Sequence, residues 1–473
     1  MELHVSLVGR KDLTGEIYRQ LRRSILDGRL KPGDRLPPTR ELARSLSVSR
    51  TTVTVAYDRL SGEGFVKARV GVGTVVDDDV PRAPARTVRT EGSLRPRPIW
   101  ATVAIPTTFE RPAAFDFRSG LPDAQLFPFQ TWRQLMAREL RASAAEIGIY
   151  AHPAGHHGLR QAIATHIGTA RGVEAGPDDV TVTNGTQQAV DIVARVLLAP
   201  GDRVAVEDPG YAPARQVFES LGARVAWVPV DKDGLVVEAI PKGTRLVYVT
   251  PSHQYPLGMS MSLPRRGALL AWARRHDAAI VEDDYDSEFR FGGRPIEPLQ
   301  TLDTSGRVIY VGSFSKTTLP TLRLGFVVAP ASLHTAIQAA KFVTDWHTQL
   351  PAQAALARFI DQGLFARHLR RMRGVYQKRH DMIVDFVTHE LAGHLQLIPS
   401  AAGLHVTAAA HTASADIMAA VLRRAAAAGV RAQSLSAFYH GTQGQPGLVL
   451  GYGAIPTAHI PEGLRRLRQS FQN

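Results

Sequence analysis

The sequence predicts an α/β protein in two parts: a small basic helical segment that ends in a strand hairpin, and a larger domain built on a mostly parallel sheet. Three observations predict this. Apolar residues recur every three or four positions through residues 13–62, which is the period of amphipathic helices. Short Val- and Ile-rich runs, bounded by Gly, Pro or Asp, recur through residues 179–329 and are typical of buried parallel strands. Residues 1–76 carry fourteen Lys and Arg but eight Asp and Glu, about half of the net charge of +13.

The composition excludes several classes of protein. Of the 473 residues, 44% are hydrophobic, which is enough for a folded core and excludes wholesale disorder. No apolar run approaches the ~18 residues needed to cross a bilayer, and the N-terminus has no secretory apolar segment. The absence of Cys excludes disulfides, thiolate metal sites and a Cys nucleophile. We therefore expect a cytoplasmic protein with no membrane partner.

The first two helices follow from apolar spacing and turn residues. Residues 13–27 place Ile17, Leu21 and Ile25 on one face of a helix. A Pro-Gly turn then interrupts the chain, and Thr39 is suited to cap a second helix over the segment TRELARSL. Two short helices in succession are the start of a helix-turn-helix.

A third helix and a hairpin complete this segment. Ser49 is suited to cap a helix that runs to about Gly62, and residues 65–76 indicate two short strands around a pair of glycines. This segment is typical of a winged helix-turn-helix, which has two helices, a tight break, a helix with a polar first turn and a glycine hairpin. We expect this domain to span residues 1–76.

The polar start of the third helix favours double-stranded DNA as a partner. Its first turn would enter the major groove, where short hydroxyls and Arg reach base edges and phosphates, and the hairpin glycine lets the backbone approach closely. The candidate DNA-binding residues are Arg35, Arg40, Ser49, Arg50, Thr51, Thr52 and Gly71. The alternatives are a three-helix core without DNA binding and a basic surface that is merely solvated.

Residues 77–112 predict a linker, because they are rich in Pro, Arg and small residues and have no sustained period. A role of their Arg residues in DNA binding is an alternative to a solvated tether. Residues 113–473 then form the larger domain, with helices expected on both faces of its sheet and a smaller C-terminal subdomain. Ligands of such sheets bind outside the carboxyl ends of the strands.

Two of these strand ends suit an anion. One strand runs into the segment NGTQQ at residues 184–188, where Gly permits a sharp turn and the free N–H groups of the following helix suit a phosphate. Many strand-to-helix turns look alike, so this signal is weak alone. Arg323 offers a planar fork of donors for the same kind of group.

Three further strand ends carry chemistry that the residues alone leave open. Asp283 begins the segment DDYD, whose acids could bind a metal, cap a helix or face a heterocycle nitrogen; a metal is disfavoured because no His or calcium-loop pattern accompanies them. Lys316, between small hydroxyl residues, could be a nucleophilic amine or a surface amine. Tyr211 could stack on a planar ligand or pack in the core.

The order of these features matches the needs of pyridoxal phosphate, which requires an amine, a carboxylate for its ring nitrogen and a phosphate cradle. The motifs TNGTQQA, EDPGY, EDDYDSEFR, GSFSK and LRLGF resemble, in that order, those of fold-type-I aminotransferases, over residues 113–473. Residues 11–76 resemble the DNA-binding domain of GntR-type bacterial regulators. The combination is similar to the MocR subfamily of GntR regulators, in which an aminotransferase-like domain senses an effector.

The resemblance implies a role for each marked residue. Lys316 would carry pyridoxal phosphate as an internal aldimine, Asp283 would pair with its ring nitrogen, and Tyr285 would bond its phenolic oxygen. Tyr211 would lie against the ring. The phosphate would be held by Gly185, Thr186, Gln187, Ser313, Ser315 and Arg323.

Two further positions extend the resemblance. Tyr150 resembles a tyrosine that reaches the phosphate from the facing subunit, which implies a head-to-tail homodimer. His253 lies in a segment that replaces the Asn-containing turn of true aminotransferases, beside the cofactor.

One departure from the aminotransferase pattern decides between the functions. Aminotransferases clamp the substrate carboxylate with an Arg near the C-terminal strand, but the corresponding LVLGYGAI has none; Arg118, Arg215 and Arg431 are the other candidates. The leading hypothesis is therefore a transcription regulator that uses its aminotransferase-like domain as a sensor of an amine, an amino acid or pyridoxal phosphate itself, with no metal and with residual transaminase chemistry left open. The alternatives are a working aminotransferase with a DNA-tethering domain and a DNA-binding protein with a degenerate core.

Overall fold

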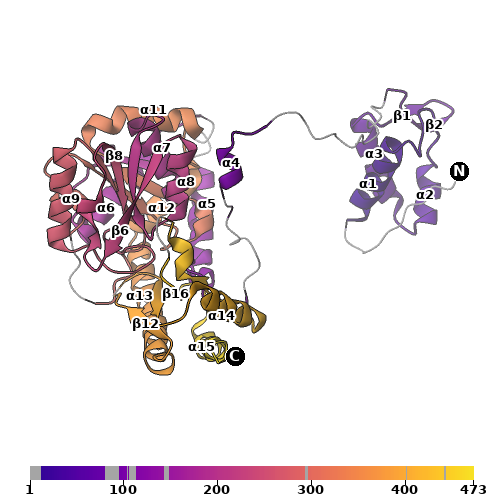
Figure 1. Cartoon of the computed structure of the whole chain (residues 1–473). Coiled ribbons are helices and arrows are strands. Elements are labelled where there is room, and N and C mark those ends of the chain that lie inside the picture. The colour runs from indigo at the N-terminus through magenta and orange to yellow at the C-terminus, as the bar shows by residue number, and fades with distance from the viewer. Residues whose placement is uncertain are drawn as a thin grey trace. The chain divides into compact units, whose positions relative to one another are not determined.

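The computed structural model describes residues 12–79, 95–103, 105, 113–142, 149–292, 297–400, 402–440 and 444–472. The chain forms two compact units, Met1–Pro96 and Arg97–Asn473 (Figure 1). Their boundary falls inside the segment expected to be a linker, of which Ile99–Thr102 form a short helix, α4. None of the helices in these ranges is long and apolar enough to span a bilayer.

The smaller unit begins with two helices joined by a turn. α1 (Leu13–Leu26) starts at Asp12, whose side chain accepts a hydrogen bond of 3.1 Å from the N–H of Gly15. α2 (Thr39–Ser45) starts after Pro38, which occupies the N-cap position without a side-chain bond. The prediction that Thr39 caps this helix is therefore wrong, because the fixed φ of Pro38 already turns the chain into the helix and Thr39 becomes its first residue.

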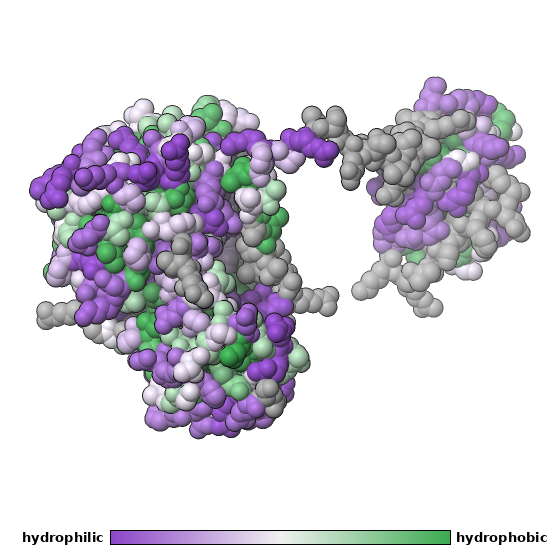
Figure 2. Space-filling model, in the orientation of Figure 1, coloured by the Kyte–Doolittle hydropathy of each residue, from purple (hydrophilic) through white to green (hydrophobic). Residues whose placement is uncertain are grey.

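α3 (Arg50–Gly62) is capped as predicted. The Ser49 hydroxyl accepts from the N–H of Thr52 at 3.1 Å, which satisfies one of the free donors at the helix start. The apolar faces of α1, α2 and α3 enclose a small core of fully buried side chains. Hydrophilic residues, purple in Figure 2, predominate on the described part of the visible face of this unit.

The hairpin of the smaller unit consists of β1 (Val66–Arg69) and antiparallel β2 (Gly73–Val76). Gly71 and Gly73 have φ of +78° and +105°, a backbone region that other residues rarely adopt, so the turn requires glycine. Ion pairs occupy the basic side chains of β1. Lys67 lies 3.0 Å from Asp77 and 2.8 Å from Asp78, and Arg69 lies 2.8 Å from Asp78. The hairpin is thus less basic than its Lys and Arg content predicts.

The larger unit is organised around an eight-stranded sheet of order β4-β11-β10-β9-β8-β5-β6-β7. The five strands from β10 to β6 run parallel to their neighbours, whereas β11 is antiparallel to β10 and β4. The strands are β4 (Val180–Thr183), β5 (Arg203–Asp208), β6 (Arg224–Asp231), β7 (Gly234–Leu235), β8 (Thr244–Val249), β9 (Ala279–Asp284), β10 (Val308–Ser313) and β11 (Gly325–Val328). The predicted mostly parallel sheet is confirmed.

Helices cover both faces of this sheet (Figure 1). In β5, Val204 and Val206 pack in the cluster formed with α7, α8 and α11, whereas Ala205 between them packs in the cluster formed with α9. Both side-chain directions are buried, which is why these strands are continuous apolar runs. The helices are α5 (Phe129–Ala142), α6 (His157–Arg171), α7 (Thr186–Leu197), α8 (Ala212–Ser220), α9 (Leu263–Arg275), α10 (Leu299–Leu302), α11 (His334–Asp345) and α12 (Leu350–Asp361).

The C-terminal part of the chain forms the smaller subdomain that was expected, drawn in orange to yellow in Figure 1. Its antiparallel sheet has the order β12-β13-β16-β15, and a short parallel pair joins β14 to β3 near the start of the unit. The elements are α13 (Leu364–Glu390), β12 (Leu395–Ile398), β13 (His405–Ala410), α14 (Ala415–Ala427), β14 (Val430–Arg431), β15 (Gln433–Ser434), β16 (Gly447–Gly451), α15 (Ile460–Gln469) and β3 (Phe115–Asp116).

Candidate functional site

A cavity of about 510 Å³ lies at the carboxyl ends of the central strands, where the sequence predicts the site. Nine of the predicted cofactor residues line it: Thr186, Gln187, Tyr211, Asp283, Tyr285, Ser313, Ser315, Lys316 and Arg323. Gly185 and His253 lie just behind its wall, and Tyr150 lies outside it. The sheet thus brings together side chains that are up to 137 positions apart in the sequence.

Lys316 follows β10 and projects into the cavity. Its Nζ donates a hydrogen bond of 2.6 Å to the backbone carbonyl of Gly120, which holds the amine in place. Burial lowers the pKa of Lys316, and the carboxylates of Asp286 and Asp283 oppose that shift. A lowered pKa leaves more of the amine neutral, which is the form that attacks an aldehyde.

Asp283 is the penultimate residue of β9 and is 4% exposed. One carboxylate oxygen accepts a hydrogen bond of 2.5 Å from the Tyr248 hydroxyl, whereas the other, Oδ1, is buried with no partner. Burial raises the pKa of Asp283 to about 7, against the effect of Tyr248. A buried carboxylate oxygen without a partner suits an N–H donor from a ligand, and the protonated ring nitrogen of pyridoxal phosphate is such a donor.

The turn from β4 into α7 forms an anion cradle. Gly185 has φ of +77° and stands at the N-cap of α7, so the N–H groups of Thr186 and Gln187 begin the helix. Arg323 donates to the carbonyl of Asn184 at 2.8 Å, and a Cβ added to Gly185 would lie 2.8 Å from its Nη2. Glycine is therefore required both by the backbone and by the approach of the guanidinium. The set of donors fits a phosphate.

Aromatic rings form the next wall of the cavity. Tyr211 and Tyr255 meet edge to face with centroids 5.8 Å apart, and Tyr255 meets Tyr285 at 5.8 Å and 90°. Burial raises the pKa of Tyr211 and of Tyr285, so both hydroxyls remain protonated donors at neutral pH. The Tyr285 hydroxyl lies 2.9 Å from Nδ1 of His253. His253 therefore contacts a tyrosine that lines the cavity and does not line the cavity itself.

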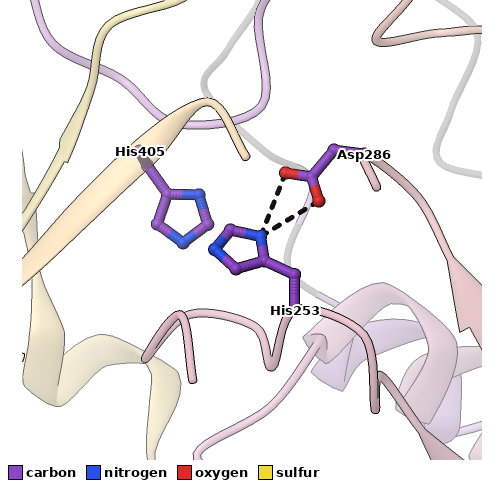
Figure 3. Close-up of side chains that lie close together, drawn as sticks. All are labelled: His253, Asp286 and His405. Atoms are coloured by element: carbon purple, nitrogen blue, oxygen red, sulfur yellow. Dashed lines mark hydrogen bonds and ion pairs between the residues drawn. The ribbon is translucent and has the colours of Figure 1, made fainter. Parts of the chain in front are cut away.

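Beside Tyr285, three buried side chains converge from three segments of the chain: His253 after β8, Asp286 after β9, and His405 on β13 (Figure 3). His253 Nδ1 lies 3.0 and 3.2 Å from the two oxygens of Asp286. Burial and the neighbouring His253 lower the pKa of His405 to about 3.

Nitrogen or oxygen atoms of these three residues lie within 4.8 Å of one another, a spacing compatible with a metal ion. Hydrogen bonds already engage both nitrogens of His253, both oxygens of Asp286 and one nitrogen of His405. The two nitrogens of His253 face Asp286 and Ser400, and Nε2 of His405 lies 3.0 Å from the carbonyl of Pro256. The close approach of His253, Asp286 and His405 is explained by this hydrogen-bonded network.

The three candidate carboxylate clamps all lie outside the cavity lining, so those expectations are wrong. Arg118 is buried in a two-point ion pair with Asp116, at 2.5 Å through Nη2 and 2.9 Å through Nε. Arg215 pairs with Glu219 at 2.9 Å on α8. Arg431 lies on β14 and is not among the residues that line the cavity. Within the described ranges, Arg323 is the one guanidinium that lines the cavity.

Several cavity residues were missed by sequence reasoning. Tyr255 is two residues from the predicted His253, and Asp286 lies in the motif EDDYDSEFR, so their proximity to predicted residues was a usable signal. Gly120, His405 and Gln433 come from segments with no motif, and tertiary folding alone brings them to the cavity.

Tyr150 is 74% exposed and stacks on Trp346 with ring centroids 4.2 Å apart. Its neighbours Ile149, Phe342 and Val343 are exposed as well. Tyr150 is not among the residues that line the cavity of its own chain.

The predicted DNA-binding residues are grouped on the smaller unit. Arg50 and Thr51 are exposed at the first turn of α3, whereas the hydroxyls of Ser49 and Thr52 lie 2.8 Å apart and engage each other in the cap. Arg35 and Arg40 are exposed, and Arg35 would approach a Cβ on the hairpin residue Gly73 to 3.4 Å. Gly71 is exposed at the hairpin turn. The surface combines cations with short hydroxyls.

Comparison with known proteins assigns both units. Residues 13–76 match the model of bacterial regulatory proteins of the gntR family, and residues 115–444 match that of aminotransferase class I and II. The chain is 40% identical, over 96% of its length and 93% of the relative, to the probable rhizopine catabolism regulatory protein MocR of Rhizobium meliloti. The chain belongs to the MocR subfamily of GntR-type transcription regulators.

Other relatives and solved structures agree with this assignment. The MocR-type chain is 32% identical to the pyridoxine biosynthesis regulator PdxR of Corynebacterium glutamicum, over 93% of this chain and 91% of that one. Its fold is similar to that of kynurenine aminotransferase from Pyrococcus horikoshii (TM-score 0.70, 28% identity, 76% of this chain and 90% of that one). It is also similar to LysN of Thermus thermophilus, solved with N-(5'-phosphopyridoxyl)-L-leucine (TM-score 0.69, 30% identity, 76% and 92%). The chain is thus a DNA-binding regulator with an aminotransferase-like domain.

Proposed function

We propose that this regulator binds pyridoxal phosphate through Lys316 and that an effector acting at this centre alters its binding to DNA. The observation that carries the proposal is one cavity that holds a desolvated amine, a buried carboxylate oxygen without a partner, and a Gly185–Arg323 anion cradle. When bound, the cofactor supplies an aldehyde that condenses reversibly with primary amines. This chain's residues hold that aldehyde against Lys316.

Each remaining residue has a part in holding the cofactor. Asp283 accepts from the ring nitrogen through Oδ1, and Tyr285 donates to the phenolic oxygen while His253 fixes the tyrosine from behind. Tyr211 lies against the ring. The phosphate is held by Arg323 and the turn residues Gly185, Thr186, Gln187, Ser313 and Ser315. The larger domain, 113–473, is thus the sensor, with 1–76 as the DNA-binding domain and 77–112 as the linker.

We propose further that the active form is a head-to-tail homodimer, in which Tyr150 of one protomer reaches the phosphate of the other. An exposed apolar patch supports this: Tyr150, Ile149, Phe342, Val343 and Trp346. Exposed apolar clusters of this kind mark protein interfaces. On the DNA side, residues 49–52, Arg35, Arg40 and Gly71 make the contacts, in the cytoplasm where the promoter lies.

The experiment compares the wild-type protein with Lys316→Ala and with Lys232→Ala, whose lysine is exposed in a turn far along the chain from the site motifs. We expect pyridoxal phosphate to give a visible absorbance band with the wild type and Lys232→Ala, and none with Lys316→Ala. Borohydride followed by peptide mass spectrometry should place the label on Lys316. The effect of the cofactor on binding to DNA upstream of its own gene should vanish with the band. A band that persists in Lys316→Ala would contradict the proposal.

A further inference from the structure

The cavity also indicates what the effector is, because its two walls differ in charge. The wall at the strand ends carries the cofactor-facing groups. A second part of the lining, called the second wall, is made by residues 119–121 and by the C-terminal subdomain, through Leu404, His405, Gln433 and Phe438. Lys316 Nζ lies 2.6 Å from the carbonyl of Gly120, so the reacting amine of any effector arrives against this second wall. This inference rests on the proposed function.

No cation is free on the second wall to meet a ligand carboxylate, within the described lining. Lys316 is the point of attachment, and Arg323 belongs to the phosphate cradle beside Asn184. His405 is a neutral imidazole at pH 7, because burial and the adjacent His253 depress its pKa to about 3. A carboxylate placed here would be buried without a charged partner, which costs binding free energy.

An anion instead faces the incoming amine. Asp286 is 2% exposed, contributes to the cavity lining and is held by His253 at 3.0 and 3.2 Å (Figure 3). Its charge acts on the Lys316 amine more strongly than that of Asp283. The charge of Asp286 also contributes to the raised pKa of Tyr285. A carboxylate this close attracts an ammonium group and repels a second carboxylate.

The remaining polar groups of the second wall are neutral. The Ser119 N–H and hydroxyl both donate to Gln433 Oε1 at 2.8 Å, and the Tyr255 hydroxyl lies 3.0 Å from Ser119 Oγ. The amide N–H₂ of Gln433 takes no part in these bonds. Hydroxyls and amides pair well with ligand hydroxyls, whereas an Arg would be needed to bind a carboxylate at two points.

We propose that the effector is a primary amine without a carboxylate, whose other polar groups are neutral or cationic. Its nitrogen replaces that of Lys316 on the cofactor's aldehyde carbon. The C=N bond to the effector forms as the one to Lys316 breaks, and the two amine protons pass to Lys316. The exchange needs no oxidant or reductant. Release of Lys316 from the cofactor is the change that the DNA-binding response then reports.

The test uses full-length protein loaded with pyridoxal phosphate and pairs of compounds that differ by one carboxylate: ethanolamine with serine, histamine with histidine, and putrescine with ornithine. The concentrations giving half-maximal change in the absorbance band and in DNA affinity are measured. We expect the amine of each pair to act at a concentration about tenfold to a hundredfold lower, the cost of one buried unpaired group. Amino acids that act as well as the amines overturn the proposal.

A variant sharpens the result. Gln433→Arg supplies the missing guanidinium and should narrow the gap within each pair by roughly tenfold, whereas Gln433→Met, of similar size and uncharged, should keep the preference for amines. An equal effect of both variants would contradict the charge argument. If no compound acts while the band stays on Lys316, the effector class is wrong and the cofactor proposal stands. If no band forms, both fail.

Discussion

The two functional regions of this regulator are specified in opposite ways. The proposed DNA-binding surface is contiguous: residues 49–52 occupy one helical turn, and Arg50 is exposed. The proposed cofactor cavity is assembled from segments between residues 119 and 438, and Asp283, which lines it, is buried. In the first region, substitution of an exposed side chain such as Arg50 is expected to affect function alone, whereas Ser49 also caps α3. In the second, function and stability depend on the same groups.

The largest effect in this comparison is expected for Asp283→Asn in the cavity. Loss of a charge-assisted hydrogen bond worth about 1.5–3 kcal/mol should weaken pyridoxal phosphate binding roughly tenfold to a hundredfold. Absorbance titration with the cofactor measures this. An unchanged affinity would mean that the partnerless Oδ1 does not face the ring.

The same variant tests the link to stability in the cofactor-free protein. Burial raises the pKa of Asp283 from 3.8 to about 7, so the folded state binds this proton more tightly than the unfolded state. The resulting stabilisation is complete below pH 4 and is lost as the pH rises through 7. Between pH 5 and pH 8, the melting temperature should therefore fall more steeply for the wild type than for Asp283→Asn. Parallel curves would contradict the raised pKa.

An intermediate effect is expected for Gly185→Ala. The added Cβ would meet the Arg323 guanidinium at 2.8 Å, and φ of +77° is strained for alanine, so we expect a loss of about 1–3 kcal/mol in stability and roughly tenfold in cofactor affinity. Gly201→Ala is the matched control, since Gly201 has φ of +96° with nothing within 4 Å. It should lose stability alone. Equal cofactor affinity in Gly185→Ala and Gly201→Ala would mean that the Gly185–Arg323 cradle does not bind the phosphate.

The smallest effect is expected for Arg50→Ala on α3. DNA affinity should fall severalfold with a salt dependence shallower by ~1, and the melting curve should not move, because the side chain is exposed. Arg274→Ala, exposed on α9, is the control and should change neither quantity. The DNA affinity of both variants and its salt dependence are measured by DNA mobility over a range of salt concentrations. If Arg50→Ala failed to fold, the difference between the two regions in how function and stability are linked would be contradicted.

The contrast also explains what could be predicted from sequence. Helix caps, hairpin glycines and buried parallel strands depend on neighbours in the chain, so the winged helix-turn-helix and the sheet were predicted and are confirmed. Thr39 failed as a cap because Pro38 set the backbone first. The strand-end residues Asp283 and Lys316 were found because parallel strands align their ends.

The second wall of the cavity could not be predicted in the same way. His405 and Gln433 reach the site only because the antiparallel subdomain folds back, and no local pattern marks them. The search for a carboxylate clamp failed for a related reason. Arg118 looked available in the sequence, but its short-range partner Asp116 engages it in the fold.

The acidic residues behind the hairpin set how this regulator responds to ionic strength. Lys67 and Arg69 are already neutralised by Asp77 and Asp78, so approach of a DNA backbone to that hairpin displaces few condensed sodium or potassium ions. We therefore expect the number of ions released on promoter binding to depend mainly on the exposed arginines outside the hairpin, Arg35, Arg40 and Arg50.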